Sequence, residues 1–247
     1  MFLRVVLSFI IIGISFSTSS AQQSWDDYVY YDTFQMANSS FFSPYTVFSD
    51  ISDSGVIVGY FRDTDNSYTG LVYYKNGKTI SYKYTGYTHT EILGVTSSGQ
   101  ILGRAYSTPA SAIVFTADLV NYKVHSATEV NWNGSTNNYK WPSKMNENGI
   151  GSGSVQSSTQ RWLHYEQIDG STTIDKTVRY KKSSTTYNTY GQGINDNLLA
   201  VGYYLDGSRR VPFVYSDGDN RFDIADHVLD HGLQGTIFND MYTVSKK

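Results

Sequence analysis

Hydrophobic and polar positions recur along the chain in one short pattern: an apolar residue, a polar turn and an apolar strand. The first copy reads Ile51-Ser-Asp-Ser-Gly55-Val-Ile-Val-Gly59. Four further segments align with it without gaps, and they begin at Val95, Met145, Ile194 and Phe238. Successive copies start 44, 50, 49 and 44 residues apart, which is the spacing of β-propeller blades.

Each part of the pattern has a local structural meaning. Asn, Asp and Ser side chains satisfy backbone groups in a tight turn, and a glycine such as Gly55 accepts a positive φ there. The strand then ends in a second glycine, such as Gly59, which suits a place where strands crowd together, as at the centre of a ring. Each copy continues with a second, aromatic or β-branched strand, a polar turn and a third strand. The second strands are Leu71–Tyr74, Ile113–Phe115, Trp162–Tyr165 and Phe213–Tyr215.

The repeats predict an all-β fold, a five-bladed β-propeller with blades of about 45 residues. The last copy stops at Lys247 without a second strand, whereas Tyr28–Tyr31 resembles Leu71–Tyr74. We expect these N- and C-terminal segments to pair in one blade and close the ring, because closure removes an exposed sheet edge. An open β-solenoid or stacked array is the alternative.

The N-terminus has the pattern of a secretory signal peptide. Arg4 is followed by the short apolar stretch Val5–Phe16 and then by small residues that end at Ala21. We predict a signal peptide over residues 1–21, a single propeller domain over 22–247, and secretion to the extracellular space or the periplasm. An uncleaved anchor is the alternative. No later stretch of the sequence has the length and hydropathy of a membrane span.

Composition narrows the function classes further. The 22 tyrosines favour half-buried β-surfaces, and the absence of cysteine excludes disulfides and Cys-ligated zinc. The net charge of −3 comes without a basic stripe, so we expect no nucleic-acid partner.

The residues also resemble a family. Ile-Asn-Asp-x-Gly-x-Ile-Val-Gly-Tyr, followed by an apolar strand and Asp-Gly, is similar to the HAF-type extracellular repeats of bacterial secreted proteins. Ile51–Tyr60, Ile194–Asp196, Val211–Tyr215 and Phe238–Asp240 match best. The resemblance covers nearly the whole mature chain and implies a secreted repeat architecture without an activity. The chain departs from the family in its aromatic second strands, where the family prefers His-Ala-Phe, and in the lost glycines of the last copy.

Acidic residues recur at the third motif position. Asp53, Glu147, Asp196 and Asp240 occupy it, and Ser97 replaces them in the second copy. Glycosidases on five-bladed propellers use carboxylates from several blades, and a channel cation site is a further interpretation. Recurrence in most copies favours turn formation, since chemistry would single out particular blades.

Other candidate chemistry is weaker. His227 and His231 have the i, i+4 spacing of a helical metal site but lack the glutamate of the zincin motif. No Gly-x-Ser-x-Gly segment supports a Ser-His-Asp triad. We therefore predict no catalytic residues, no metal site and no cofactor.

The most variable positions point to a binding site. The residues after the final motif glycine are Tyr60, Arg104, Ser154 and Tyr203, and we expect them near one mouth of the channel. An insertion, Val130–Trp141, adds Trp132 and Trp141, whose flat faces suit a sugar or peptide. Filling the space between blades is the alternative for both tryptophans. The predicted ligand-binding residues are Tyr60, Arg104, Tyr203, Trp132 and Trp141.

These features favour a secreted, non-catalytic binding or adhesion module that recognises a glycan, as lectins do, or a surface protein. The alternative is an extracellular carbohydrate-active hydrolase on the same fold.

Overall fold

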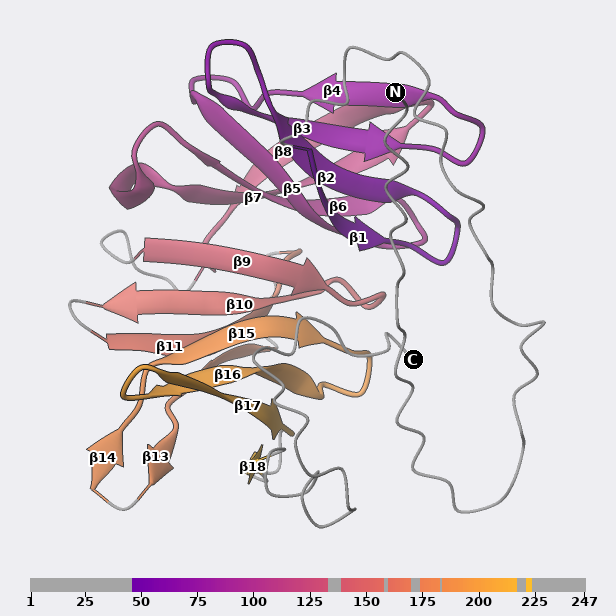
Figure 1. Cartoon of the computed structure of the whole chain (residues 1–247). Helices are drawn as coiled ribbons and strands as arrows, with labels where there is room; N and C mark the ends of the chain where they lie inside the picture. The colour runs from indigo at the N-terminus through magenta and orange to yellow at the C-terminus, as the bar shows by residue number, and fades with distance from the viewer. Residues whose placement is uncertain are drawn as a thin grey trace, which may run out of the picture. The chain divides into compact units, whose positions relative to one another are not determined.

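The computed structural model describes residues 46–132, 139–157, 160–169, 174–182, 184–216 and 221–223. All of them belong to one compact unit, Ser43–Lys247. Their regular structure is β, apart from 3-10 turns at η2 (Pro109–Ser111) and at Trp132 (Figure 1). Within these ranges no helix is suited by length and hydropathy to crossing a membrane. The predicted signal peptide lies outside the described residues.

The strands form four antiparallel sheets of four strands each, and we call these sheets blades 1 to 4 (Figure 1). Blade 1 consists of β1 (Val47–Ile51), β2 (Ile57–Arg62), β3 (Tyr68–Tyr73) and β4 (Thr79–Tyr82). Blade 2 consists of β5 (His89–Val95), β6 (Gln100–Tyr106), β7 (Ile113–Val120) and β8 (Lys123–Val130). Blade 3 consists of β9 (Tyr139–Met145), β10 (Ile150–Ser157), β11 (Gln160–Gln167) and β12 (Asp175–Val178). Blade 4 consists of β15 (Thr189–Ile194), β16 (Ala200–Asp206), β17 (Arg209–Tyr215) and β18 (Arg221–Asp223), and a small hairpin, β13 (Lys181–Lys182) with β14 (Thr185–Thr186), precedes it.

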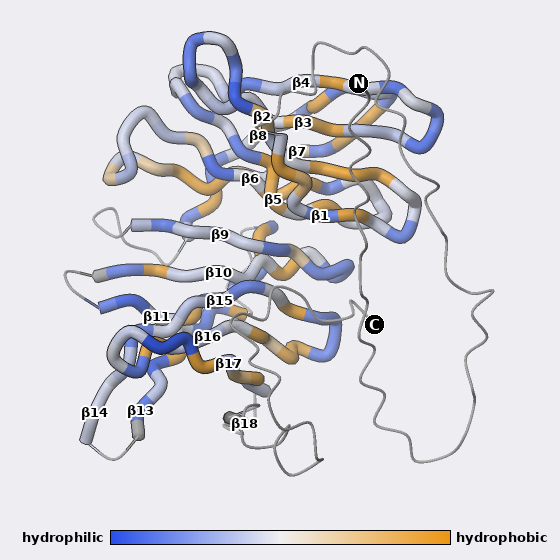
Figure 2. The backbone as a smooth tube through the Cα atoms, viewed as in Figure 1, coloured by the Kyte–Doolittle hydropathy of each residue, from blue (hydrophilic) through white to orange (hydrophobic). Residues whose placement is uncertain are grey.

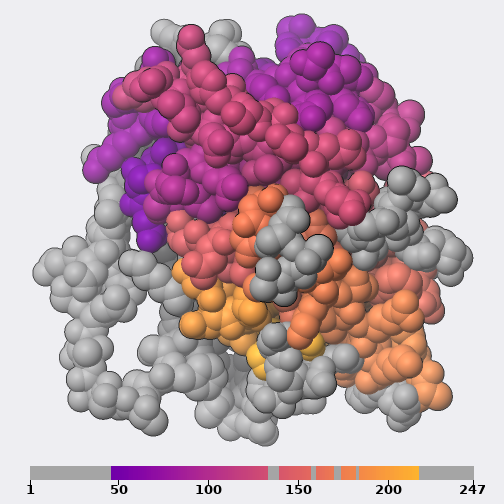
Figure 3. Space-filling model, turned by 180° about the vertical axis from the view of Figure 1, so that it is seen from behind, coloured from indigo at the N-terminus to yellow at the C-terminus, as the bar shows by residue number. Residues whose placement is uncertain are grey.

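Each blade packs on the one before it in the same way. The first strand of a blade lies against the middle strands of the preceding blade, so that β5 contacts β2 and β3, and β15 contacts β10 and β11. The first strands also contact one another in series, from β1 through β5 and β9 to β15. Seen from the far side, the indigo-to-magenta surface of blades 1 and 2 adjoins the pink and orange surface of blades 3 and 4 (Figure 3). This arrangement is β-propeller-like.

The described residues hold four blades, so the prediction of five is not supported. The fifth blade was predicted from Tyr28–Tyr31 and the motif that begins at Phe238, and both segments lie outside the described residues. The strands predicted at Leu71–Tyr74, Ile113–Phe115, Trp162–Tyr165 and Phe213–Tyr215 are confirmed as the third strand of each blade, β3, β7, β11 and β17, with only Tyr74 lying just beyond β3. The insertion is shorter than predicted, because Val130 ends β8 and Trp141 lies within β9.

The motif makes the same turn in all four blades. In blade 3, the Asn146 N–H donates to Ile150 O, and the Gly149 N–H donates to Asn146 O. The Asn146 side chain then accepts the Ile150 N–H at 2.8 Å. Ser52, Thr96 and Asn195 form the equivalent side-chain bond in their own turns. The polar second position is therefore selected because its oxygen satisfies a backbone donor inside the turn.

Glycine is required at the final motif position because a neighbouring strand of the same sheet leaves no room for a side chain. A Cβ on Gly59, Gly153 or Gly202 would lie 2.0–2.1 Å from a carbonyl oxygen of the first strand. In each blade the first strand carries a β-bulge beside this glycine, which accompanies the close approach of that carbonyl. The crowding of strands expected from the sequence is therefore present, and for these three glycines the nearest contact comes from the neighbouring strand of the same sheet.

The core follows the blade boundaries. Hydrophobic residues concentrate in the sheets, whereas the hairpins are hydrophilic (Figure 2). One buried cluster joins blades 1 and 2 around Phe115, and another joins blades 3 and 4 around Tyr165 and Phe213. Asp50 of blade 1 accepts the Val95 N–H at 3.0 Å and also meets Lys144 of blade 3 at 3.4 Å. Polar contacts between blades therefore accompany the apolar core.

Candidate functional site

The two ends of the blades differ. At one end, the motif end, lie the four turns described above. We call the other end the cluster end. There the first strand of each blade begins (β1, β5, β9 and β15) and the strand after it ends (β2, β6, β10 and β16). Cross-strand pairs at this end join Val47 to Tyr60, Glu91 to Arg104, Trp141 to Ser154 and Tyr190 to Tyr203. Residues that follow the motif glycine thus meet residues of the preceding strand.

In blades 1 and 2, this end is organised by a buried carboxylate. Glu91 binds the Arg104 guanidinium through Oε2 at 2.9 Å and accepts the Tyr106 hydroxyl through Oε1 at 2.8 Å. Arg104 also lies over the Tyr106 ring, 4.6 Å from its centroid. Both carboxylate oxygens are therefore engaged, and the charge of Arg104 is compensated locally.

The same environment keeps the nearby phenols neutral. Burial, followed by the negative charge of Glu91, raises the pKa of Tyr60 to about 12. Burial and Glu91 also raise the pKa of Tyr106 well above its ordinary value. Both hydroxyls therefore keep their protons at physiological pH, and Tyr60 can act as a hydrogen-bond donor.

In blades 3 and 4, the cluster end is organised by an arginine between aromatic rings. The Arg161 guanidinium lies 3.7 Å from the Trp141 ring centroid and 4.6 Å from the Tyr190 ring centroid. Trp141 stacks on Tyr139 with centroids 5.3 Å apart, and Tyr190 stacks on Tyr203 at 4.6 Å. Cation–π contacts and stacked rings hold these side chains in a continuous array.

The charged groups of blades 2 and 3 influence each other at the cluster end. Burial lowers the pKa of Arg161, and the positive charge of Arg104 lowers it further, while Tyr190 and Tyr203 oppose the shift. The two guanidinium groups therefore lie close enough for their charges to interact, and Glu91 is paired with Arg104. We call this set the aromatic–arginine cluster, and its members are Tyr60, Glu91, Arg104, Tyr106, Tyr139, Trp141, Arg161, Tyr190 and Tyr203.

Four of the five predicted ligand-binding residues lie in the aromatic–arginine cluster: Tyr60, Arg104, Trp141 and Tyr203. Trp132 lies elsewhere. It is 0% exposed and packs edge-on against His164, with ring centroids 4.9 Å apart. Its environment matches the alternative drawn from the sequence, in which this tryptophan fills space between blades.

Five members of the cluster were not among the predicted residues: Glu91, Tyr106, Tyr139, Arg161 and Tyr190. Glu91, Trp141 and Tyr190 stand four residues before the apolar residue that opens the motif, outside the nine aligned positions. Extending the repeat alignment upstream would have placed Glu91 and Tyr190 beside Arg104 and Tyr203. Arg161 gave no such signal, because it is the second residue of β11, which follows a hairpin whose length differs from blade to blade.

The repeated acids serve the motif end instead. Glu147 Oε2 accepts the N–H of Ser97 at 2.6 Å, and Asp196 Oδ1 accepts the N–H of Glu147 at 2.9 Å. Each carboxylate thus receives the N–H at the same motif position of the preceding blade. For Glu147 and Asp196, these bonds indicate a structural role in docking one blade on the next, while Asp240 lies outside the described residues.

A buried histidine network offers the nearest approach to a metal site. His164 Nε2 lies 2.9 Å from Glu166, and Nδ1 lies 3.1 Å from the Thr177 hydroxyl and 3.9 Å from Asp175. These groups lie close enough together to surround an ion. Hydrogen bonds to Glu166 and Thr177 use both ring nitrogens in this structure. His227 and His231 lie outside the described residues.

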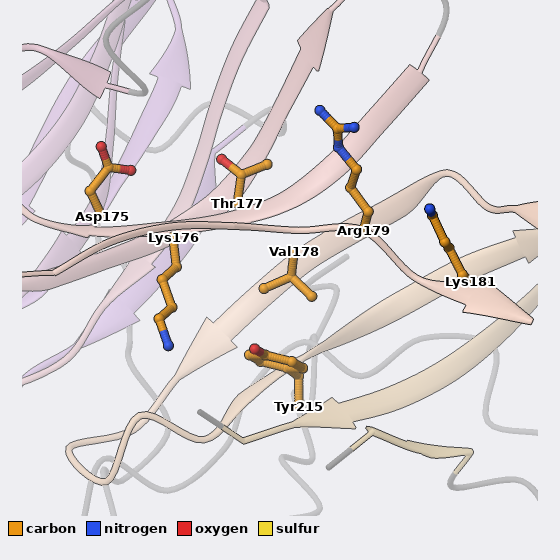
Figure 4. Close-up of a pocket in the computed structure, with 7 residues that line it drawn as sticks. All are labelled: Asp175, Lys176, Thr177, Val178, Arg179, Lys181 and Tyr215. Atoms are coloured by element: carbon orange, nitrogen blue, oxygen red, sulfur yellow. The ribbon is translucent and has the colours of Figure 1, made fainter. Parts of the chain in front are cut away.

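A shallow hollow beside β12 holds several charged side chains. It has a volume of about 620 Å³ and is lined by Asp175, Lys176, Thr177, Val178, Arg179, Lys181 and Tyr215. Asp175, Thr177 and Arg179 project to one side of the strand, whereas Lys176 and Val178 project to the other, toward Tyr215 (Figure 4). This alternation is that of a β-strand, so the polar groups diverge and do not form one binding site.

Comparisons with known proteins identify no relative of this chain. A scan against protein-family models finds no match. A search among curated proteins finds no similar sequence either.

Proposed function

We propose that the chain is a secreted, non-catalytic binding module that holds a glycan at the aromatic–arginine cluster. The observation that carries this proposal is the placement of Tyr60, Arg104, Trp141 and Tyr203 at the same end of blades 1 to 4. Sugars are bound by flat aromatic faces flanked by polar groups, and the cluster supplies both. The predicted signal peptide over residues 1–21 supports secretion.

The exposed edge of the cluster gives the sharpest test. Tyr139 is 37% exposed and stacks on Trp141, whereas Tyr122 is 39% exposed and meets Tyr74 edge to face at the motif end. We expect Tyr139→Ala to weaken glycan binding about threefold to tenfold, because a sugar face loses a stacking ring. Tyr122→Ala is the matched control and should leave binding unchanged. A glycan array identifies the bound sugar, and titration of that sugar into both variants measures the effect.

Equal binding by the two variants would contradict the proposed location. Arg104→Ala and Trp141→Ala extend the test, with thermal melting recorded for each. Loss of binding with unchanged melting supports a site, whereas lowered melting without a separate effect on binding means that these residues only pack. Release of a shortened sugar from the array would instead favour the hydrolase alternative.

We also propose that the blades close into a five-bladed ring through segments outside the described residues. The support is the surface of β1, where Val47, Phe48 and Ile51 are 42%, 40% and 41% exposed. The equivalents of Phe48 and Ile51 in blade 2 are Ile92 and Val95, which are fully buried against blade 1. The apolar face of β1 therefore matches a surface that a further blade covers.

Removing residues 22–40 is expected to destabilise the whole domain, since it takes away the predicted closing strand at Tyr28–Tyr31. We expect the melting temperature to fall by at least about 5 °C, the shift given by a loss of roughly 2 kcal/mol in a domain of this size. Phe48→Ser should lower melting in the full chain and have no further effect in the truncated one. Identical melting of the truncated and full chains would rule out closure by this segment.

A further inference from the structure

We propose that the glycan bound at the aromatic–arginine cluster carries a carboxylate, as a uronic acid does, and that Arg161 receives it. This inference rests on the proposed function and names the chemical class of its ligand. It is carried by the difference between the two arginines of the cluster.

Arg104 and Arg161 have the same charge but different partners. Arg104 is paired with Glu91 at 2.9 Å, and that carboxylate is fully used. Among the described residues, the Arg161 side chain has no acidic partner within ion-pair distance, and its one hydrogen bond joins Nη2 to the Gln156 amide oxygen at 3.1 Å. Its Nε is buried and makes no hydrogen bond within that part of the chain. The cluster therefore holds one uncompensated positive charge.

The orientation of Arg161 limits what can approach it. Trp141 lies 3.7 Å from the guanidinium and Tyr190 lies 4.6 Å from it, so aromatic rings occupy its environment and favour contact through the edge. A guanidinium edge presents N–H groups in a planar fork, which matches the two oxygens of a carboxylate. A lysine in the same place would supply charge without this geometry.

The neighbouring rings suit a sugar that bears such a group. Tyr139 and Trp141 lie nearly parallel, 11° apart, and Tyr139 is exposed to solvent. Tyr139 and Arg161 both contact Trp141, so we expect a sugar held at this edge of the cluster to direct a ring substituent toward Arg161. Burial lowers the pKa of Arg161, in agreement with a cation that is poorly hydrated in the free protein.

The test compares one oligosaccharide in two charge states. Oligogalacturonate and its methyl-esterified form are titrated into the full chain by calorimetry. We expect the acid to bind at least about tenfold more tightly than the ester, the preference that one charge-assisted hydrogen bond confers. Arg161→Gln should reduce the ratio of the two affinities to near one, and Arg161→Lys should leave an intermediate ratio.

The matched control is Arg179→Gln. Arg179 also lies over a tryptophan, 4.2 Å from the Trp162 ring centroid, but outside the cluster, so its loss should preserve the ratio. Binding of dextran sulfate is measured in the same way, with uncharged dextran as the reference. This comparison distinguishes a site for carboxylates from a site for any anion.

The outcomes are distinguishable. Equal binding of acid and ester overturns the acidic ligand while leaving a glycan site in place. An acid preference that survives Arg161→Gln overturns the role of Arg161, and equal preference for sulfate overturns the carboxylate. Failure of both forms, together with a blank glycan array, removes the proposed function itself.

Discussion

Gly153→Ala is expected to lower the free energy of unfolding by about 3 kcal/mol, the upper part of the range for overpacking a core. A Cβ at this position would lie 2.1 Å from Trp141 O and 2.7 Å from Pro142 Cα. Both are backbone atoms of β9, so neither can move aside by changing a rotamer. Relief requires the first strand of blade 3 to shift.

That shift would also reach the next blade. Gly191 of β15 packs closely on Gly153, since a Cβ on Gly191 would lie 2.3 Å from Gly153 O. We therefore expect the damage to cross from blade 3 to blade 4, with a loss of cooperativity in urea-induced unfolding.

Gly77→Ala is the control for replacing a glycine. Gly77 has a φ of +85° in an exposed turn, and a Cβ there would meet nothing within 4 Å. Its cost is the backbone strain alone, about 1 kcal/mol. Equal unfolding free energies for the two variants would contradict the close approach of the strands in blade 3.

Asn146→Ala is expected to cost about 3 kcal/mol, because it leaves two buried backbone groups without partners. Asn146 is fully buried. Its Oδ1 accepts the Ile150 N–H within the turn, and its Nδ2 donates to Asn195 O in blade 4 at 3.0 Å. The side chain therefore supports both its own turn and the contact with the next blade.

Asn146→Ser separates these two roles. Serine occupies the equivalent position in blade 1, where Ser52 Oγ accepts the Val56 N–H at 3.1 Å. The serine variant should keep the bond within the turn and lose the bond between blades, at a cost of about 1 kcal/mol. If alanine and serine give the same unfolding free energy in urea, the bond within the turn contributes nothing.

The sequence was most informative about local structure. Residues such as Gly149 and Asn146 predict the turn because the φ of +73° at Gly149 and the side-chain bond of Asn146 depend on neighbours within a few positions. The strand at Phe213–Tyr215 followed from β-branched and aromatic residues in the same local way. Blade number depends on chain closure, which is set by contacts between distant segments.

The candidate site was predictable in part for the same reason. Tyr60, Arg104 and Tyr203 were found because they share one repeat position. Trp132 and Trp141 were predicted from the same aromatic-rich segment. In the structure, however, Trp132 is buried beside His164 and Trp141 lies under Arg161. Pairing across strands and blades decides between these environments, and a single sequence does not encode that pairing in its local pattern.

The most direct test of the central proposal locates the ligand on the protein. Hydrogen–deuterium exchange is measured on the full chain with and without a glycan retained on the array. We predict slower exchange at the cluster end, around Tyr139–Trp141 and Arg161, with no change at the motif turn that contains Asn146. Protection confined to the β12 hollow or to the motif turns, with none at the cluster end, would contradict a glycan site in the aromatic–arginine cluster.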